Sequence, residues 1–156
     1  MVKLLVLVLV LMVGACAPRP LTAELVDDRV VLPSQDINKS VYVRHYLLMI
    51  IVSDEDLPFT TSHSFMLSAP REVWVGVYAQ TGSFWTSAPA GLEIVSRRED
   101  FPEFVHGGCE IVNVVADAHT GETLGSWCNV DNRSEDGPTR PIPYYIPAHS
   151  PLGDDW

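Results

Sequence analysis

The stretch that decides the fold is Cys109-Glu-Ile-Val-Asn-Val-Val-Ala-Asp-Ala-His-Thr-Gly-Glu-Thr-Leu-Gly-Ser-Trp-Cys128. Its two flanks, residues 111–116 and 122–127, are rich in β-branched and aromatic side chains, which favour strands. Between them, Asp117 can bond the backbone of its own turn and Gly121 can take a positive φ. The stretch therefore predicts a β-hairpin with one cysteine near each end.

The predicted pairing brings the two cysteines close together. If the residues that flank the turn oppose each other, Cys128 faces Ile111, and Cys109 lies two residues away on the same face. Such a diagonal separation is somewhat long for a disulfide, and a β-bulge near Gly108 or Gly125 would correct it. We expect a Cys109–Cys128 disulfide, because exported thiols usually oxidise and this spacing lacks the paired C-x-x-C pattern of a zinc site.

Three earlier segments also have strand patterns. Residues 41–52 alternate at first, with Tyr42, Arg44 and Tyr46 on one face, and are then apolar on both faces, as in a central strand. A helix capped by Asp36 is the alternative for this segment. Residues 72–79 place valines at 73, 75 and 77 on one face, and residues 92–95 form a shorter strand candidate.

One short helical turn is predicted at residues 96–101, where Ser96 and Glu99 can form a capping box. Prolines and glycines separate the strand candidates at the spacing of short antiparallel strands. The predicted class is α+β, mainly an antiparallel β-sheet with a disulfide-linked hairpin and one short helix. The globular domain is expected to span residues 36–130.

The first fifteen residues predict a secretory signal peptide. Lys3 precedes ten uninterrupted apolar residues from Leu4 to Val13, and Gly14-Ala15 supplies the small residues of a cleavage site. The apolar core is shorter than the ~20 residues that an ordinary membrane span needs. We therefore expect export from the cytoplasm and removal of residues 1–15.

Val13-Gly14-Ala15-Cys16 resembles the lipobox of bacterial lipoproteins. The resemblance implies cleavage before Cys16, acylation of its thiol and attachment to the membrane of the cell envelope. Ala17 in place of an aspartate would favour sorting to the outer membrane of a double-membraned bacterium. Acylation would also account for the odd third cysteine. Cleavage after Ala17 with release to the periplasm or medium, and a retained N-terminal anchor, are the alternatives.

A second resemblance concerns the hairpin. Residues 114–124, Val-Val-Ala-Asp-Ala-His-Thr-Gly-Glu-Thr-Leu, resemble the strand-turn-strand element of PepSY-type domains and of other small exported bacterial proteins. This resemblance is limited to those residues and implies a shared hairpin, without any activity.

The segments on either side of the domain are rich in proline. Residues 16–35 carry Pro18, Pro20 and Pro33, and we expect a lipidated N-terminus and linker there, with an edge strand at residues 30–32 as the alternative. Residues 131–156 form a tail with five prolines and the pair Tyr144-Tyr145. These aromatics favour packing of the tail onto the body, and a partner-binding segment or disorder are the other possibilities.

The net charge limits the classes of partner that we expect the protein to bind. The chain has 20 acidic against 10 basic side chains, and its formal net charge is −10. Nucleic acid is therefore not an expected partner, because its phosphates would be repelled. A partner recognised by charge should be cationic, although solubility alone also explains the negative charge.

Catalytic motifs are not found in the sequence: there is no G-x-S-x-G, H-E-x-x-H, Walker loop or dinucleotide fingerprint. Among the scattered histidines, His45 is expected to be a sheet residue and His119 a solvent-exposed turn residue, while His106 is the least improbable functional one. Asp54-Glu55-Asp56 lacks the spaced ligands of a calcium loop. We expect no catalytic residue, metal or cofactor.

These observations predict a non-enzymatic, lipid-anchored envelope protein that binds or scaffolds another envelope component and meets the membrane through Cys16. The alternative is an acidic inhibitor or binder of a cationic protein such as a lysozyme. A hydrolase would need a pocket that gathers His106 or His45 with carboxylates and a serine or threonine nucleophile.

Overall fold

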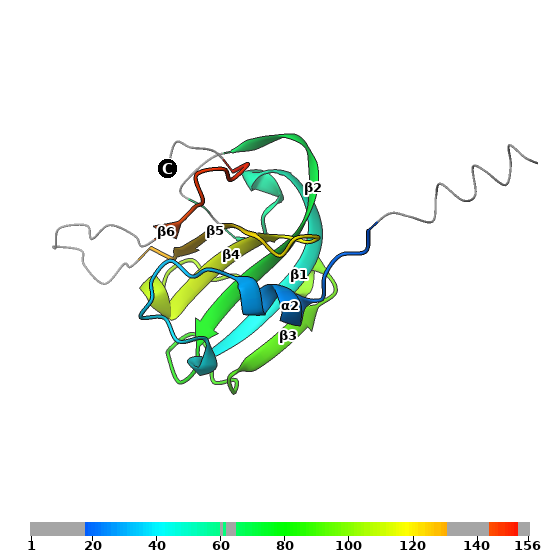
Figure 1. Cartoon of the computed structure of the whole chain (residues 1–156). Coiled ribbons are helices and arrows are strands. Elements are labelled where there is room, and N and C mark those ends of the chain that lie inside the picture. The colour runs from blue at the N-terminus through cyan, green and yellow to red at the C-terminus, as the bar shows by residue number, and fades with distance from the viewer. Residues whose placement is uncertain (1–17, 60, 62–64, 131–143, 153–156) are drawn as a thin grey trace, which may run out of the picture.

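A six-stranded sheet organises the chain (Figure 1). The structure is a computed structural model, and it describes residues 18–59, 61, 65–130 and 144–152. The strand order is β3-β1-β2-β4-β5-β6, and all pairs are antiparallel except β1 with β3, which is parallel. The strands are β1 (Tyr42–Ser53), β2 (Met66–Gln80), β3 (Gly91–Val95), β4 (Ile111–Asp117), β5 (Thr123–Cys128) and β6 (Tyr144–Tyr145). The predicted α+β class with a mainly antiparallel sheet is confirmed.

The two central strands follow the predicted alternation. Tyr42 and Tyr46 of β1 lie on one face of the sheet, and Val43 and Leu47 lie on the other. The helix considered for residues 41–52 is therefore wrong. β2 begins before the predicted residue 72, and Pro70 lies in the stretch where the pairing with β1 becomes irregular. Proline is tolerated there because it has no N–H to donate to a regular ladder.

The predicted hairpin is formed by β4 and β5. Asp117 and Glu122 flank the turn, and the backbone N–H of Asp117 donates to the carbonyl of Glu122 (2.9 Å). β5 carries one extra residue, Leu124, so that the register shifts and Cys128 pairs with Val112. A bulge therefore lies near Gly125, but it does not correct the register as expected, because it moves Cys128 from opposite Ile111 to opposite Val112, one residue farther from Cys109.

The disulfide links the ends of this hairpin. Cys109 lies in the 3₁₀ turn η4 (Gly108–Glu110), which precedes β4, and its Cα is 4.6 Å from that of Cys128. Gly107 and Gly108 both have positive φ in this turn, which is a conformation that glycine adopts readily. The predicted Cys109–Cys128 pairing agrees with this geometry.

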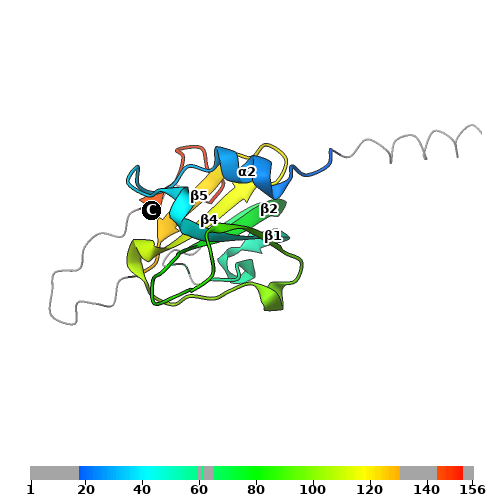
Figure 2. The same ribbon diagram turned by 90° about the horizontal axis from the view of Figure 1, so that it is seen from below.

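The two faces of the sheet are covered differently. The short helix α2 (Ala23–Arg29) lies across one face, which we call the helix face (Figure 2). Loops cover the other, which we call the loop face, and its core contains Leu57, Phe59, Phe101 and Leu152 from three separate parts of the chain. Within the described residues, no helix is long and apolar enough to cross a membrane.

The N-terminal segment differs from the linker that its prolines suggested. Thr22 caps α2, and Ala23, Val26 and Val30 are buried against the sheet. Leu21 is held to the hairpin turn, because its N–H donates to the carbonyl of Ala118 (2.7 Å). The edge strand considered at residues 30–32 is absent there, and the folded body begins at about residue 21 rather than 36.

The helical turn expected after Ser96 also differs. Only the 3₁₀ turn η3 (Arg98–Asp100) forms, and its cap is Arg97 without a side-chain hydrogen bond, so the predicted capping box is wrong. Instead, the Arg97 side chain binds the carboxylate of Asp100, with an Nε to Oδ2 distance of 2.7 Å. Among the residues that the structure describes, α2 is the one α-helix.

The end of the described chain packs onto the body. Tyr144 and Tyr145 pair with β5 as an added edge strand, and Leu152 is 2% exposed in the core of the loop face. The hydroxyl of Ser150 donates to the carbonyl of Leu124 (2.5 Å). The packing expected from the tail aromatics is confirmed for residues 144–152, and residues 131–143 and 153–156 lie outside the described residues.

Candidate functional site

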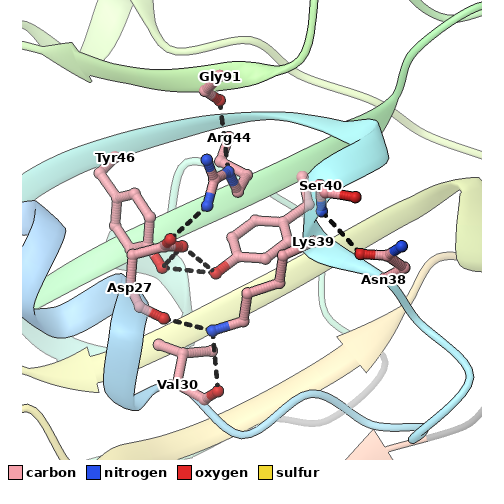
Figure 3. A network of polar contacts seen from close by, with 9 residues as sticks. Asp27, Val30, Asn38, Lys39, Ser40, Arg44, Tyr46 and Gly91 are labelled. Atoms are coloured by element: carbon pink, nitrogen blue, oxygen red, sulfur yellow. Dashed lines mark hydrogen bonds and ion pairs between the residues drawn. The ribbon is translucent and has the colours of Figure 1, made fainter.

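The densest group of interacting ionisable side chains surrounds Asp27 of α2 (Figure 3). Asp27 is 4% exposed, and its carboxylate accepts hydrogen bonds from the hydroxyls of Tyr78 (2.6 Å) and Tyr46 (3.1 Å). The two hydroxyls also contact each other at 2.7 Å. Arg44 forms an ion pair with the second carboxylate oxygen. We call Asp27, Lys39, Arg44, Tyr46 and Tyr78 the Asp27 network.

Lys39 and Arg44 connect this carboxylate to the surrounding backbone. The Nζ of Lys39 donates to the carbonyls of Asp27 and of Val30 (3.1 Å to Val30), which lie at the end of α2. A lysine at this position satisfies carbonyls that a helix leaves unpaired at its C-terminus. Arg44 Nε donates to the carbonyl of Gly91 (3.4 Å), so the network also reaches β3.

Burial sets the protonation of the two tyrosines. Desolvation raises the pKa of Tyr46 well above its usual value, and the neighbouring negative charge of Asp27 raises it further. The pKa of Tyr78 is raised by the same burial and by the charges around it. Both phenols therefore stay protonated and act as donors to the carboxylate. Burial lowers the pKa of Lys39, against the attraction of Asp27.

The Asp27 network cannot act on an external substrate, since the carboxylate is covered by α2 and the sheet. What it does is fix the position of α2. Burying a carboxylate costs free energy unless an opposite charge and hydrogen bonds replace its lost hydration. Asp27 has these partners when α2 is placed so that its carboxylate lies against the hydroxyls of Tyr46 and Tyr78.

The sequence-predicted histidines lie in separate places. His45 is on β1 and pairs with Glu93 of β3, with 3.2 Å between Nδ1 and Oε2, and burial lowers the pKa of His45. The carbonyl of His106 accepts from the side chain of Asn129, which follows β5, and two strands, β2 and β4, separate β5 from β1. The structure therefore does not bring His45 and His106 together.

His119 is less exposed than predicted. Its ring is 34% exposed and pairs with Glu72, with 3.0 Å between Nε2 and Oε2. Within the part of the chain that the structure describes, no three histidine, cysteine, aspartate or glutamate side chains gather in a way that could hold a metal ion.

An acidic cleft lies beside the 3₁₀ turn η2 (Asp54–Asp56). It has a volume of about 290 Å³ and combines three carboxylates with an apolar floor, its lining being Asp54, Glu55, Leu57, Pro58, Phe59, Glu103, Phe104 and Val105. Val105 is 69% exposed. We call this site the η2 cleft. Its mixture of negative charge and apolar surface suits a basic side chain with a long aliphatic stem.

The turn that shapes the η2 cleft is well braced. The carboxylate of Asp56 accepts from the backbone N–H groups of Val52 (2.6 Å) and Ser53 (3.0 Å), and these bonds hold the pKa of Asp56 below its usual value. From outside, the guanidinium of Arg98 donates to the carbonyls of Asp56 (2.7 Å) and Leu57 (2.8 Å). These hydrogen bonds hold the backbone of the turn in place and so fix the shape of the η2 cleft.

A second, wider groove of about 530 Å³ runs beside the disulfide, between residues 34–42 and 107–110. Tyr42 forms part of its wall and donates its hydroxyl hydrogen to the carbonyl of Cys109 (2.7 Å). Of the sequence-predicted site residues, Cys109 lines this groove and Cys128 is buried behind it through their disulfide, whereas Cys16 lies outside the described residues.

Sequence reasoning did not find Asp27, because its segment was taken as a linker. A helical signal was nevertheless present: Thr22 is a good N-cap, Arg29 suits the last turn, and Ala23, Val26 and Val30 are spaced for one helical face. The η2 cleft gave no comparable signal, since Glu103 joins Asp54 and Glu55 only through the fold.

No protein-family model, curated protein or solved structure matches the chain. Its function has to be argued from its own residues.

Proposed function

We propose that the protein is a non-enzymatic, lipid-anchored component of the bacterial cell envelope that binds or scaffolds another envelope component. The proposed anchor is a diacylglycerol on the thiol of Cys16, in a lipoprotein of the outer membrane. The proposal gives the protein no catalytic role and no cofactor.

The observation that carries this proposal is the use of the three cysteines. Cys109 and Cys128 pair with each other in the hairpin, which leaves Cys16 as the one remaining thiol. An unpaired thiol is a liability in an oxidising compartment, and acylation removes it. Cys16 is also the residue that completes the lipobox pattern Val13-Gly14-Ala15-Cys16.

The place where the fold begins also supports anchoring. Leu21, the first residue held to the hairpin, is five residues after Cys16. Five residues span at most about 18 Å when fully extended. A lipid on Cys16 would therefore hold the folded body at the membrane surface.

The intact mass of the protein extracted from membranes tests the anchor. We expect a mass that corresponds to cleavage before Cys16, attached acyl chains and one disulfide. The Cys16→Ser variant should lose the acyl mass and leave the membrane fraction. As a matched control, Ala17→Asp changes the next residue and should keep the lipid while altering sorting between the membranes. A mass without acyl chains, ending at cleavage after Ala17, would contradict the proposal.

A second candidate function is the binding of a cationic protein, and the η2 cleft favours it. Glu55 and Glu103 are exposed on either side of the apolar floor, and Met66, 80% exposed, extends the apolar surface beyond Asp54 and Glu55. A basic partner such as a lysozyme would find complementary charge and apolar contact in one place.

Salt and charge variants test this second candidate. Hen lysozyme is a suitable probe, and its binding should weaken sharply as ionic strength rises, because salt screens exposed charges. Neutralising the cleft with Asp54→Asn, Glu55→Gln and Glu103→Gln should weaken binding roughly tenfold at low salt. The control neutralises three exposed acids elsewhere, Glu24→Gln, Asp28→Asn and Asp36→Asn. Equal losses in both triple variants would show that only the net charge matters.

A further inference from the structure

An exposed apolar patch lies on the helix face, beyond the area that α2 covers. Ile50 and Val52 of β1 are 63% and 38% exposed, and Ile94 of β3 is 54% exposed. Ile94 pairs with Tyr46 of β1, and Leu48 and Ile50 follow Tyr46 at alternate positions on the same face. We call Leu48, Ile50, Val52 and Ile94 the β1/β3 patch. Contiguous exposed apolar residues of this kind mark contact surfaces more often than scattered ones do.

The patch lies next to the point where the chain enters the fold. The carbonyl of Leu21 accepts a hydrogen bond from Trp74 Nε1 (2.9 Å), and Trp74 stands directly opposite Leu48 in the β1–β2 pair. The Ala118 N–H donates to the carbonyl of Glu72 (3.1 Å), the residue opposite Ile50. Leu21 and the patch therefore share one face and one end of the sheet.

Charged side chains border the patch at this end. Glu72, the acidic residue opposite Ile50, lies with its Oε2 3.0 Å from Nε2 of His119. Arg29 lies nearby, because its guanidinium donates to the carbonyl of Thr120 in the hairpin turn (2.7 Å). Acidic side chains adjoin the other end of the patch, because the Asp56 carboxylate accepts from the Val52 N–H (2.6 Å) and Glu55 is exposed in the same turn. The patch itself consists of apolar side chains, so its contact with a membrane would be apolar rather than electrostatic.

We infer that the β1/β3 patch rests on the lipid bilayer, with Ile50, Val52 and Ile94 at the boundary between headgroups and acyl chains. The inference rests on the proposed lipid on Cys16. With a tether of five residues, the bilayer lies within about 18 Å of Leu21, and the patch is the apolar surface beside it. Apolar contact then adds to the lipid anchor as a second membrane signal and fixes the orientation of the body.

The cysteine pattern allows a clean test. With Cys16 acylated and Cys109–Cys128 oxidised, an introduced cysteine is the one reactive thiol. We would prepare lipidated Ile50→Cys and Phe84→Cys proteins, label each with an environment-sensitive NBD fluorophore, and reconstitute them in phosphatidylethanolamine–phosphatidylglycerol vesicles that contain doxyl-labelled lipid. Phe84 is the matched control, since it is 93% exposed and follows the opposite end of β2.

The expected result is quenching at position 50 that exceeds quenching at position 84 by roughly twofold or more, because only the former lies at the acyl boundary. Ile94→Cys should behave like Ile50→Cys, which guards against an effect of one label on folding. Flotation of the vesicles reports the anchor separately. Flotation with equal quenching at all three positions would overturn the membrane contact alone, whereas failure to float would overturn the lipid anchor and this inference with it.

Discussion

Different kinds of interaction stabilise the two faces of the sheet. Beneath α2, the helix face buries a carboxylate that is matched by an arginine and two tyrosine hydroxyls. On the loop face, the apolar cluster of described residues includes Leu47, Val75 and Trp127, and the polar side chains buried beside it are neutral. Asn113, for example, donates to the side-chain oxygen of Asn129 (2.5 Å). A buried charge with its partners specifies one face, and apolar packing with neutral polar groups specifies the other.

This difference shows on which face the fold depends most on the identity of particular side chains. An apolar core accepts many side chains of similar volume, whereas a buried charge is tolerable only where its partners are in place. α2 has only seven residues, which is too short for stability on its own. The Asp27 network therefore fixes the position of α2, and the loop face supplies most of the hydrophobic stabilisation.

The largest expected effect comes from breaking the network at its centre. Asp27→Ala should lower the free energy of unfolding by about 3–5 kcal/mol, because it leaves the half-buried Arg44 without its ion-pair partner and the buried hydroxyls of Tyr46 and Tyr78 without their acceptor. Denaturant unfolding measures this loss. Asp28→Ala is the matched control, an exposed neighbour on the same helix, and should change stability by less than about 0.5 kcal/mol. Equal effects would mean that the network does not hold α2.

On the loop face, Leu47→Ala should cost about 3 kcal/mol, because Leu47 is 4% exposed and its loss leaves a cavity. Ile50→Ala on the same strand should cost far less, since its side chain is exposed. Thermal and denaturant unfolding compare the two variants. The loop-face loss should be the same at every pH between about 6 and 9, whatever happens on the helix face.

Gly76→Ala probes the space under the network. A methyl group at this position would lie 2.9 Å from Tyr46 Cε1, and the bond to Asp27 prevents the ring from moving aside. We expect a loss of about 1–3 kcal/mol from this overpacking. Gly91→Ala, which meets no atom within 4 Å, should leave stability unchanged or slightly improved. A neutral Gly76→Ala would show that the helix face is loosely packed.

The smallest effect is a pH dependence confined to the helix face. Because the folded-state pKa values of Tyr46 and Tyr78 are raised, the folded protein keeps protons that the unfolded chain loses above about pH 10. Their contribution is complete below that pH and falls as pH rises, by up to about 1.4 kcal/mol per pH unit for each tyrosine. Unfolding curves at rising pH should show this slope, reduced in Tyr78→Phe and unchanged in Leu47→Ala.

Local patterns were sufficient to predict much of the sheet. β1, β2 and the β4–β5 hairpin show the alternation of side chains that half-buried strands need, and Asp117 and Gly121 form the turn that their chemistry suggested. The bulge at Leu124 does not bring the two cysteines together, since it pairs Cys128 with Val112; the 3₁₀ turn η4 places Cys109 beside Cys128 instead.

The rest depended on contacts between distant segments. Prolines around α2 indicated an extended linker, and burial against the sheet made the short helix stable despite them. No local pattern predicts that β3 runs parallel to β1, because β2 lies between them in the chain and the loop after β2 crosses back to the edge beside β1. Asp27 similarly has no distinguishing neighbours in sequence, and its partners come from β1 and β2.

The added strand β6 covers an edge of the sheet at which another chain could otherwise pair. By pairing with β5, Tyr144 and Tyr145 occupy backbone groups that would otherwise offer a template for fibril growth or strand exchange. The other edge of the described sheet, β3, is only five residues long, which gives an incoming chain little to add to. Proteolytic removal of residues 144–152 would therefore be expected to expose β5 as an edge at which another chain could pair.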